Sequence, residues 1–368
     1  MPSLLPRLLK AVRWPSYVVF FVTARCNAAC KMCFYRENMD SNAAKDELTL
    51  EEYENIACRI PLINVLGISG GEPFLRPDLH HIIEILYRHC SPAVVDLPTN
   101  AFFPDRVASQ VEKIARACPN MIVDTQLSID GPPEIHDNIR GLKDGYKKVR
   151  ETYRMLLPFK KRYRNFRLKA CVVYSAYNQD HMEPLFKILQ NDFAGLDRVV
   201  FSVAHGSVCN AEAMRFDWEK YFRFCGRLRS RAQARRVTDI HSIFTMALRV
   251  AKNDLLKEVL ERKNMHELCR AGRSVIVINE TGAVFPCEPL WQPVGQLRSN
   301  GYDLKQILAS EEMKQFQRRM KREACTCHWG LPMSNTLMLS PRYYPKIFLE
   351  MAQIAWRSRK ASPQEKED

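Results

Sequence analysis

The feature that most constrains the fold is a regular alternation of short apolar segments with amphipathic segments over residues 17–204. The apolar segments are rich in β-branched and aromatic residues and have the length of buried strands. They cover residues 17–24, 64–69, 93–97, 121–129, 166–174 and 198–204. Segments with helical periodicity lie between them, over residues 49–60, 77–89, 104–117, 144–157 and 179–191. Strands that alternate with such helices form βαβ units, so we expect an α/β fold with a parallel sheet closed into a partial (β/α)6 barrel.

The rest of the chain lacks this alternation and predicts further parts. Residues 217–263 are helical, basic and poor in strands, which is typical of a connector. Apolar segments at 275–278 and 283–285 flank Gly282 and predict a small hairpin, and residues 302–322 predict a helix. We therefore predict an N-terminal amphipathic arm, a barrel, a connector, a small α+β module, a C-terminal helix and a disordered charged tail, over residues 1–15, 16–216, 217–263, 264–330, 331–361 and 362–368.

Composition and charge exclude some classes of protein and favour certain partners. Hydrophobic residues make up 46% of the 368 residues and charged residues 26%, which excludes a disordered or fibrous chain. There are 55 Lys and Arg against 41 Asp and Glu, for a net charge of +14. This charge favours acidic partners, such as nucleic acid, an anionic membrane surface or an acidic protein. The densest basic run is more simply a solvated helix face; it contains Arg227, Arg229, Arg231, Arg235 and Arg236.

The N-terminus and the cysteines bear on the compartment. No apolar run approaches the roughly 18 residues that cross a bilayer. Basic residues and the apolar run 17–24 precede Cys26 and resemble a lipoprotein signal, but Arg25 occupies the position where such a signal needs a small residue. The 13 cysteines include short spacings typical of thiolate ligation, so we expect a reducing, cytoplasmic location. Both ends of the chain are amphipathic, which leaves peripheral membrane contact as an alternative to docking on the barrel.

A group of three cysteines follows the first predicted strand. Cys26, Cys30 and Cys33 form the pattern C-x3-C-x2-C. Functional loops of a parallel barrel follow the strands at their carboxyl ends. Three close thiolates suit a cubane iron–sulfur cluster whose fourth iron keeps no protein ligand and can chelate a small molecule. Zinc would require a fourth ligand, and this loop offers no His and no fourth Cys.

A second motif, Gly70-Gly71-Glu72-Pro73, follows the second predicted strand. Two glycines let a backbone approach a ligand closely, and the Glu72 carboxylate can accept a hydrogen bond from an ammonium group. An ordinary turn between a strand and a helix would explain the tetrapeptide equally well. Its place on the strand next to the cysteine loop favours one shared ligand site.

With these two motifs at this separation, residues 16–210 resemble the radical S-adenosylmethionine (SAM) superfamily. The resemblance implies that Cys26, Cys30 and Cys33 hold a [4Fe-4S] cluster whose open iron binds the amino and carboxylate groups of SAM. It also implies that the loop 70–73 binds the SAM amino group. The activity implied is reductive cleavage of SAM to methionine and a 5′-deoxyadenosyl radical, which abstracts hydrogen from a substrate.

The same resemblance implies roles for further residues near the strand ends. In similar enzymes, a Ser and an Arg at such positions contact the SAM carboxylate or ribose, and Ser128 and Arg140 match them here. A surface charge that flanks a helix is the simpler alternative for Arg140. Residues expected to line the cofactor pocket are Thr99, Asn100, Asp130 and Asn178.

One position departs from the family pattern. The superfamily usually has an aromatic residue near the adenine, at the position of Met32 in this chain. A methionine can still pack against a ring, and Phe34 and Tyr35 are alternatives for that contact.

A second group of cysteines lies in the C-terminal half. Cys269, Cys287, Cys325 and Cys327 could meet if the hairpin around Gly282 and the helix after it return the chain to one place. The pattern Cys-x12-Gly-x4-Cys resembles the twitch or SPASM extension of radical SAM enzymes, and the missing further cysteines imply one auxiliary [4Fe-4S] cluster. A structural zinc on the same four thiolates is the alternative. For the remaining cysteines we expect buried free thiols; these are Cys58, Cys90, Cys118, Cys171, Cys209 and Cys225.

The predicted reaction is oxidative, because an auxiliary cluster can take the electron of a substrate radical. We expect a small-molecule or peptide substrate, with Arg198, His205 and Asp217 as residues that could face it, although each is more often a surface or structural residue. Because only a short segment precedes the first strand, we expect no separate leader-peptide-binding domain. In a radical SAM enzyme, the basic charge is expected to attract an acidic electron donor such as a flavodoxin or ferredoxin, an anionic substrate, or RNA. Two alternatives stay open: an RNA-modifying radical SAM enzyme, and a non-catalytic module that binds an iron–sulfur cluster or zinc.

Overall fold

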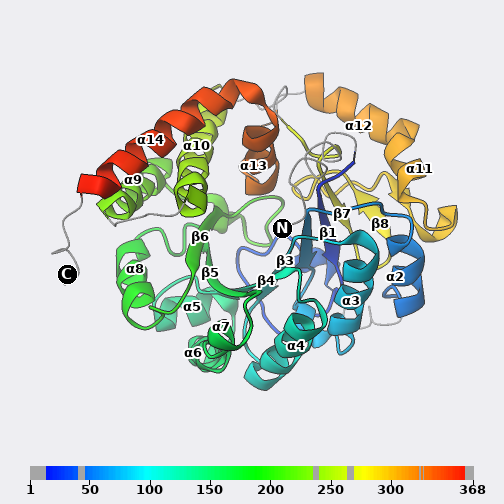
Figure 1. The fold of residues 1–368 in the computed structure, drawn as a ribbon, viewed down its shortest axis with the longest axis horizontal. Coiled ribbons are helices and arrows are strands. Elements are labelled where there is room, and N and C mark those ends of the chain that lie inside the picture. Colours follow the sequence, from blue (N-terminus) through cyan, green and yellow to red (C-terminus); the bar gives the residue numbers. More distant parts are fainter. Residues whose placement is uncertain are drawn as a thin grey trace. The chain divides into compact units, whose positions relative to one another are not determined.

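The computed structural model describes residues 14–39, 46–234, 240–262, 269–322, 325 and 327–360 (Figure 1). Contacts divide the chain into two compact units. The first unit comprises Met1–Phe216 and Ala271–Arg319, and the second comprises Asp217–Arg270 and Met320–Asp368. The expected N-terminal arm lies outside the described residues except for its last two, and the expected tail lies outside them entirely.

The first unit is built on one sheet with the strand order β6-β5-β4-β3-β2-β1-β7-β8-β9. Its first six strands pair in parallel with their neighbours in sequence. They are β1 (Tyr17–Phe21), β2 (Val65–Ser69), β3 (Val94–Thr99), β4 (Ile122–Ser128), β5 (Phe166–Tyr174) and β6 (Arg198–Val203). Helical crossovers connect them, so the partial barrel predicted from the strand–helix alternation is confirmed.

The crossover helices are α2 (Leu50–Ala57), α3 (Leu79–Cys90), α4 (Pro104–Ala117), α5 (Pro133–Arg140), α6 (Gly145–Leu156), α7 (Phe159–Arg162) and α8 (Met182–Asn191). The capping box predicted for α2 is present: Thr49 Oγ1 accepts from the Glu52 N–H, and Glu52 Oε2 accepts from the Thr49 N–H. Helices α5 and α7 were not predicted from the sequence. α5 has Pro133 in its first turn and ends at Gly141 with φ of 60°, and these are ordinary helix start and stop signals.

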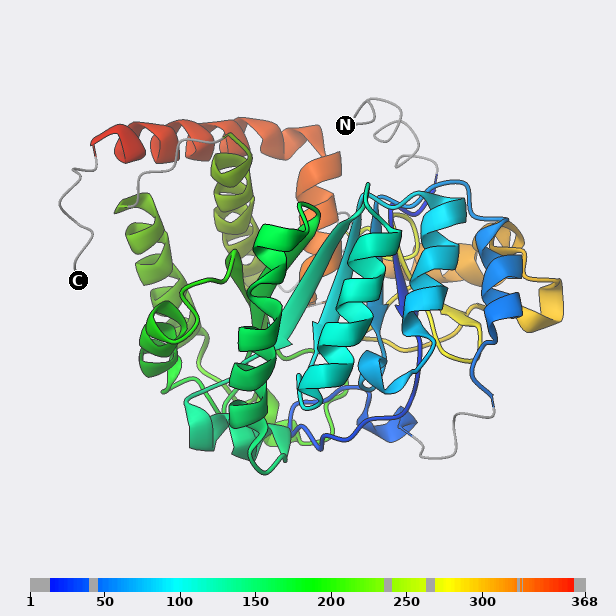
Figure 2. The same cartoon turned by 60° about the horizontal axis from the view of Figure 1, so that its bottom comes forward.

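The two faces of the barrel sheet differ in chemistry. One face packs on the helices (Figure 2). Phe20 lies on this face, since its ring centroid is 5.8 Å from that of Tyr53 in α2. Because side chains alternate along a strand, the register places Leu66, Val95 and Val123 on this face, and all three are fully buried. The opposite face carries charged residues, including Asp96 and Asp124.

The predicted hairpin around Gly282 is confirmed, and it continues the barrel sheet. β7 (Val275–Ile278) pairs in parallel with β1, while β8 (Ala283–Phe285) and β9 (Gly295–Gln296) follow in antiparallel order. The helix expected over 302–322 is two helices, α11 (Leu304–Ala309) and α12 (Glu311–Arg322). Extended backbone at Ser310 separates them, and its hydroxyl accepts a hydrogen bond from the Met313 N–H.

The second unit is helical in its described part. It contains α9 (Trp218–Ala234), α10 (Ile240–Arg262), α13 (Gly330–Leu339) and α14 (Tyr344–Lys360). Ion pairs join α14 to the earlier helices, from Arg229 to Glu350 at 2.7 Å and from Lys346 to Asp254 at 3.0 Å. The single helix expected over 331–361 is interrupted at Ser340 and Pro341, because proline disfavours helical backbone in the residue before it.

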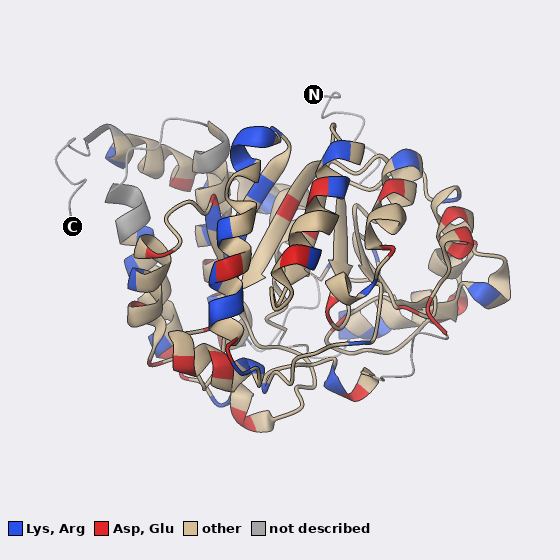
Figure 3. Cartoon of the chain, turned by 90° about the horizontal axis from the view of Figure 1, so that it is seen from below, with Lys and Arg blue, Asp and Glu red and all other residues tan. Residues whose placement is uncertain are grey.

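Two further observations concern the surface. Within the described ranges, no helix combines the length and apolar character that a membrane crossing requires. Lys and Arg are interspersed with Asp and Glu along the helices (Figure 3). Of the basic run expected on a helix face, Arg235 and Arg236 lie outside the described residues.

Candidate functional site

The first cysteine group lies on a loop that follows β1 and is held by α5. The Ala29 N–H donates to the carbonyl of Arg140 at 3.0 Å, and the Lys31 N–H donates to that of Ile139 at 2.9 Å. All three cysteines are half-buried. Burial raises the pKa of the Cys26 thiol to about 11 and of the Cys33 thiol to about 12. These thiols therefore stay protonated in the metal-free chain, and a bound cation would be needed to ionise them.

The donor set of this loop fits an iron–sulfur cluster. Among the described residues, no three side chains of His, Cys, Asp or Glu converge as the ligands of one ion do. A cubane cluster differs from a single ion because each thiolate binds a different iron. The cysteine loop also has a cationic neighbour, since Nη1 of Arg140 lies 3.7 Å from Sγ of Cys30.

Gly70 and Gly71 lie directly against the cysteine loop. A Cβ atom on Gly70 would stand 2.3 Å from the carbonyl oxygen of Thr23, and one on Gly71 would stand 2.0 Å from that of Arg25. Gly70 also has a φ of 119°, which favours glycine. This contact explains why both positions require glycine. Ligand binding by the loop 70–73 stays a prediction.

Glu72 occupies the centre of a buried hydrogen-bond network. Its Oε1 accepts from the Thr99 hydroxyl at 2.8 Å, and its Oε2 accepts from the Asn100 N–H at 2.7 Å. Burial raises the pKa of the Glu72 carboxyl to about 7. Pro73 begins the 3₁₀ turn Pro73–Leu75, whose Phe74 N–H also donates to Glu72. Hydrogen bonds to the Glu72 carboxylate thus join the loop 70–73 to the end of β3.

The hydrogen-bond network around Glu72 is linked to the cysteine loop by the side-chain amides of Asn100 and Asn27. Nδ2 of Asn100 donates to Oδ1 of Asn27 at 2.9 Å. Nδ2 of Asn27 is buried and has no hydrogen-bond partner among the described residues. A hollow of about 410 Å³ opens beside it. Its lining residues are Ala24, Arg25, Cys26, Asn27, Arg36, Met39 and Leu75. An unsatisfied donor beside a cysteine and a hollow fits a polar ligand bound next to a cluster.

Arg140 and Asp130 form a buried ion pair next to Cys30. Nε of Arg140 donates to Oδ2 of Asp130 at 2.6 Å, and Oδ1 of Asp130 accepts from the Val173 N–H at 2.8 Å. The Arg140 side chain is 11% exposed, so the alternative of a surface charge is wrong. Ser128 is buried at the end of β4. Asn178 donates through Nδ2 to the Asp130 carbonyl, and this bond connects two strand ends.

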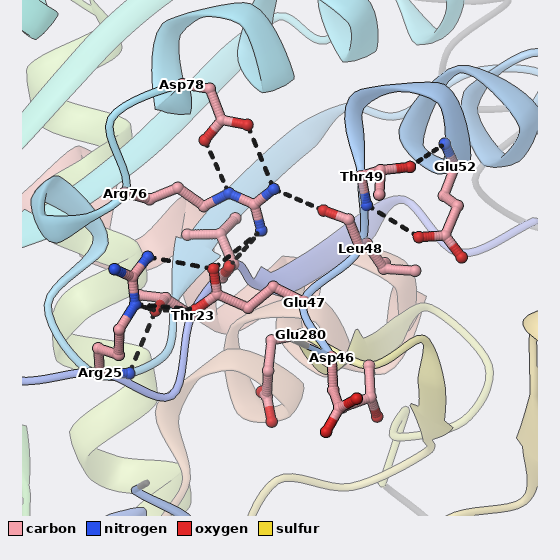
Figure 4. A network of polar contacts seen from close by, with 12 residues as sticks. Thr23, Arg25, Asp46, Glu47, Leu48, Thr49, Glu52, Arg76, Asp78 and Glu280 are labelled. Carbon is pink, nitrogen blue, oxygen red and sulfur yellow. Dashed lines mark hydrogen bonds and ion pairs between the residues drawn. The ribbon is translucent and has the colours of Figure 1, made fainter. Parts of the chain in front are cut away.

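The sequence reading missed Glu47, which anchors the start of the cysteine loop (Figure 4). The Thr23 hydroxyl donates to its carboxylate, and Nη2 of Arg25 lies 3.1 Å from Oε2. Arg76 adds an ion pair at 3.7 Å and donates to the carbonyl of Val22 at 2.8 Å. Glu47 is 8% exposed, but no local pattern distinguishes it from the exposed or half-buried acids that follow in α2.

The residues considered for the adenine contact are packed against protein. Met32 is 6% exposed and lies in an apolar cluster with Ile139 and Ala204. The Tyr35 ring is fully buried and lies 5.1 Å from that of Trp291. Its hydroxyl donates to Glu280. An adenine contact from Met32 or Tyr35 therefore lacks support in these positions.

The second cysteine group is distributed over both units. Cys287 is buried after β8 in the first unit, whereas Cys269, Cys325 and Cys327 are half-buried and belong to the second. Sγ of Cys327 accepts a hydrogen bond from the Trp329 N–H at 3.2 Å. A shared set of four thiolate ligands stays a prediction.

The remaining cysteines agree only in part with the expected burial. Cys90 and Cys118 are buried, as expected, and Cys171 and Cys225 are half-buried. Cys58 and Cys209 are exposed, so the prediction of buried thiols is wrong for them. Cys209 belongs to a later segment that contacts the cysteine loop, and its N–H donates to the Cys33 carbonyl at 2.9 Å.

Comparisons with known proteins cover both parts of the chain. Residues 20–163 match the model of the radical SAM superfamily, and residues 269–328 match that of SPASM, an iron–sulfur cluster-binding domain. The "AdoMet-dependent heme synthase" of Methanosarcina barkeri is 24% identical over 316 residues, which cover 82% of this chain and 86% of that protein.

Solved structures share the fold. The protein anSMEcpe with bound AdoMet superposes with a TM-score of 0.59 at 18% identity, covering 94% of this chain and 98% of that one. Streptococcus suis SuiB bound to its precursor peptide SuiA gives 0.60 at 15% identity, covering 86% and 70%.

Proposed function

Because the chain belongs to the radical SAM superfamily and carries a SPASM-type iron–sulfur domain, we propose that this enzyme oxidises a small-molecule or peptide substrate. The observation that carries the proposal is the convergence of three elements at the carboxyl ends of the barrel strands. These are the cysteine loop, the Gly70–Pro73 loop packed against it, and Arg140 at 3.7 Å from Cys30 Sγ. Such a convergence is what a cluster and a ligand bound to it require.

In this proposal, Cys26, Cys30 and Cys33 hold the [4Fe-4S] cluster, and SAM occupies the space beside it. When bound, the cluster and SAM supply the reductive cleavage of SAM and the radical that abstracts hydrogen from the substrate. Arg140 offsets the negative charge that the three thiolates bring to the loop. Asp130 positions Arg140 through their short, buried ion pair.

The Gly70–Pro73 loop and the neighbouring strand ends are assigned to the polar groups of SAM. The Glu72 carboxylate is buried among donors, so a nearby ammonium group would favour its ionised form. Thr99 and Asn100 hold that carboxylate in place. Asn27 offers Nδ2, which has no partner in the part of the chain that the structure describes, and Ser128 ends β4 on the face turned away from the helices.

We assign Cys269, Cys287, Cys325 and Cys327 to one auxiliary [4Fe-4S] cluster. An overall oxidation needs an acceptor for the electron of the substrate radical, and a second cluster supplies one. The match of residues 269–328 to an iron–sulfur domain supports this assignment. The net charge of +14 favours an acidic carrier such as a flavodoxin or ferredoxin as the electron donor.

A peptide or another small molecule remains the substrate class. SuiB, which shares the fold, is a protein whose structure was solved with a precursor peptide. The relative from Methanosarcina barkeri is named for heme synthesis. Besides the electron donor and acceptor, the proposed reaction needs a substrate C–H group held near SAM with water excluded.

The test is anaerobic reconstitution of the full chain with iron and sulfide. We expect about eight irons per chain, an electron paramagnetic resonance (EPR) signal of the reduced protein that changes when SAM is added, and reductive cleavage of SAM. Cys30→Ala should lose the change and the cleavage. Cys58→Ala, which removes an exposed thiol on α2's C-terminal side, is the matched control and should retain both. Zinc in place of iron, or a signal indifferent to SAM, would refute the proposal.

A further inference from the structure

A group of polar side chains lies within the barrel strands, on the face turned away from the helices. We call it the strand cluster; its members are Tyr17, Asp96, Asp124, Gln126, Lys169 and Arg198. The register places Asp96 beside Asp124, Gln126 beside Lys169, and Lys169 beside Arg198. Charged side chains in the middle of a barrel sheet are costly to bury, so each of them needs a partner.

One half of the strand cluster is satisfied by protein alone. The Tyr17 hydroxyl donates to Oδ2 of Asp96 at 2.6 Å, and Nε2 of Gln126 donates to Oδ1 at 3.0 Å. Gly67 allows this arrangement, because a Cβ atom there would stand 2.9 Å from the Tyr17 ring. Lys169 forms a close ion pair with Asp124 and lies 3.8 Å from Asp96.

The other half is incomplete. Asp124 is 3% exposed, and its Oδ1 is buried without a hydrogen-bond partner among the described residues. Among the described residues, Arg198 forms an ion pair only with Oδ2 of Asp124, at 3.7 Å, and that oxygen is already paired with Lys169. The Arg198 side chain is 35% exposed, so its donors are accessible from outside the sheet. A carboxylate oxygen that lacks a donor thus stands next to a guanidinium that lacks a full partner.

The position of this incomplete half relates it to the proposed SAM site. Asp124, Gln126 and Ser128 point to the same face of β4, since side chains alternate along a strand. Four residues of a parallel strand span about 13 Å. Asp124 therefore lies about 13 Å along β4 from Ser128, a distance that one small molecule can bridge.

We propose that the strand cluster binds the anionic end of the substrate. Arg198 takes a carboxylate or phosphate group through its planar fork of donors, and Oδ1 of Asp124 accepts a hydrogen bond from an adjacent O–H or N–H group. Tyr17, Gln126 and Lys169 hold the two aspartates in position. This inference rests on the proposed function, because it places the far end of the substrate of that same site.

The test uses acetate, glycolate and inorganic phosphate as probes, with the reconstituted full chain and ionic strength held constant by chloride. Glycolate adds to acetate one hydroxyl next to the carboxylate. We expect saturable stabilisation by at least one anion and a preference for glycolate over acetate of about fivefold in Kd, from one additional hydrogen bond. Calorimetric titration and the shift in melting temperature measure both. The comparison of phosphate with the carboxylates distinguishes the two kinds of anion.

Arg198→Gln should lose anion binding at this site, and Arg198→Lys should retain a weaker form, because lysine keeps the charge without the planar fork. Arg167→Gln is the matched control. It removes an exposed arginine from β5 at the register position opposite Asp124, where its guanidinium bonds backbone carbonyls. Binding that is equal in wild type and Arg198→Gln, or no saturable binding in wild type, overturns the inference. Equal affinity for acetate and glycolate overturns the role of Asp124.

The outcome is separable from that of the proposed function. The response of the iron–sulfur cluster's EPR signal to SAM tests the proposed function without any substrate. If that response is present and anion binding does not depend on Arg198, only the present inference fails. If anion binding depends on Arg198 and the EPR signal ignores SAM, the proposed function fails.

Discussion

The two cysteine groups differ in how far the chain around them is organised in advance. Cys26, Cys30 and Cys33 lie within eight residues on one loop, in one unit, and backbone hydrogen bonds from α5 hold that loop. Cys287 lies in the first unit, and the three other cysteines of the second group lie in the second unit. The first group therefore has a scaffold before any metal arrives, whereas ligation by the second group would itself join distant parts of the sequence. Metal loss should affect the two groups differently.

The largest expected effect is the loss of the first cluster in Cys30→Ala. Removing a direct ligand should lower SAM cleavage by more than the roughly 100-fold that loss of a neighbour of a metal ligand costs. Anaerobic cleavage assays measure this effect, with Cys58→Ala as the control. Retained cleavage would show that the preorganised loop is not the catalytic one.

The second prediction concerns Cys287→Ala. If the second group holds a separate cluster, iron content should fall by about half, and product formation should stop. The EPR signal of the remaining cluster should still respond to SAM, because the first loop keeps its own contacts. Iron analysis and EPR check this prediction, and an iron content equal to that of wild type would remove Cys287 from the ligand set.

The third prediction tests the anchoring of the first loop. Glu47→Gln removes the charge that faces Arg25 and the buried Arg76, and breaking one partner of such a network costs about 3 kcal/mol. We expect a lower melting temperature and faster loss of iron to a chelator, by about tenfold. Glu51→Gln, an exposed acid on α2, is the matched control. Equal rates of iron loss in the two variants would contradict an anchoring role.

The smallest effect is a pH dependence near the hairpin. The hydrogen bond from Arg298 holds the pKa of Glu52 at about 2, well below its usual 4.5, and Tyr302 adds a second bond. Because the folded pKa is lowered, this contribution is complete above pH 4.5 and is lost as the pH falls toward 2. Because Arg298 is partly exposed and its ion pair is screened by solvent, the contribution amounts to about 1 kcal/mol.

Melting curves between pH 6 and 3 measure this contribution. The difference in stability between wild type and Glu52→Gln should shrink as the pH falls. A difference that does not change with pH would show that the Glu52 carboxylate is not stabilised by Arg298 in solution.

Most of the fold followed from local patterns. The strand–helix alternation located all six barrel strands, and the capping box located the start of α2. The helix α5 was missed because it has only eight residues, too few for periodicity to stand out. The single C-terminal helix was wrong because Ser340 and Pro341 interrupt it.

Only part of the candidate site could be predicted from the sequence, for a physical reason. Close cysteines and paired glycines are local signals, but the reason for Gly70 and Gly71 is a contact with Thr23 and Arg25, some 46 residues earlier. The role of Glu47 depends on how its loop packs against Arg25 and Arg76, and the strand cluster depends on register between strands. A single sequence does not state which residues stand side by side in either case.

The parallel pairing of β7 with β1 has a consequence for what counts as a folding unit. A fragment that stops at residue 216 would leave unpaired N–H and C=O groups on β1 along residues 17–20, which pair with β7 in the full chain. Such an edge recruits other strands, so the fragment would tend to aggregate. A barrel fragment that is to be excised, or exchanged between relatives, would therefore need another strand to pair with β1 in place of β7.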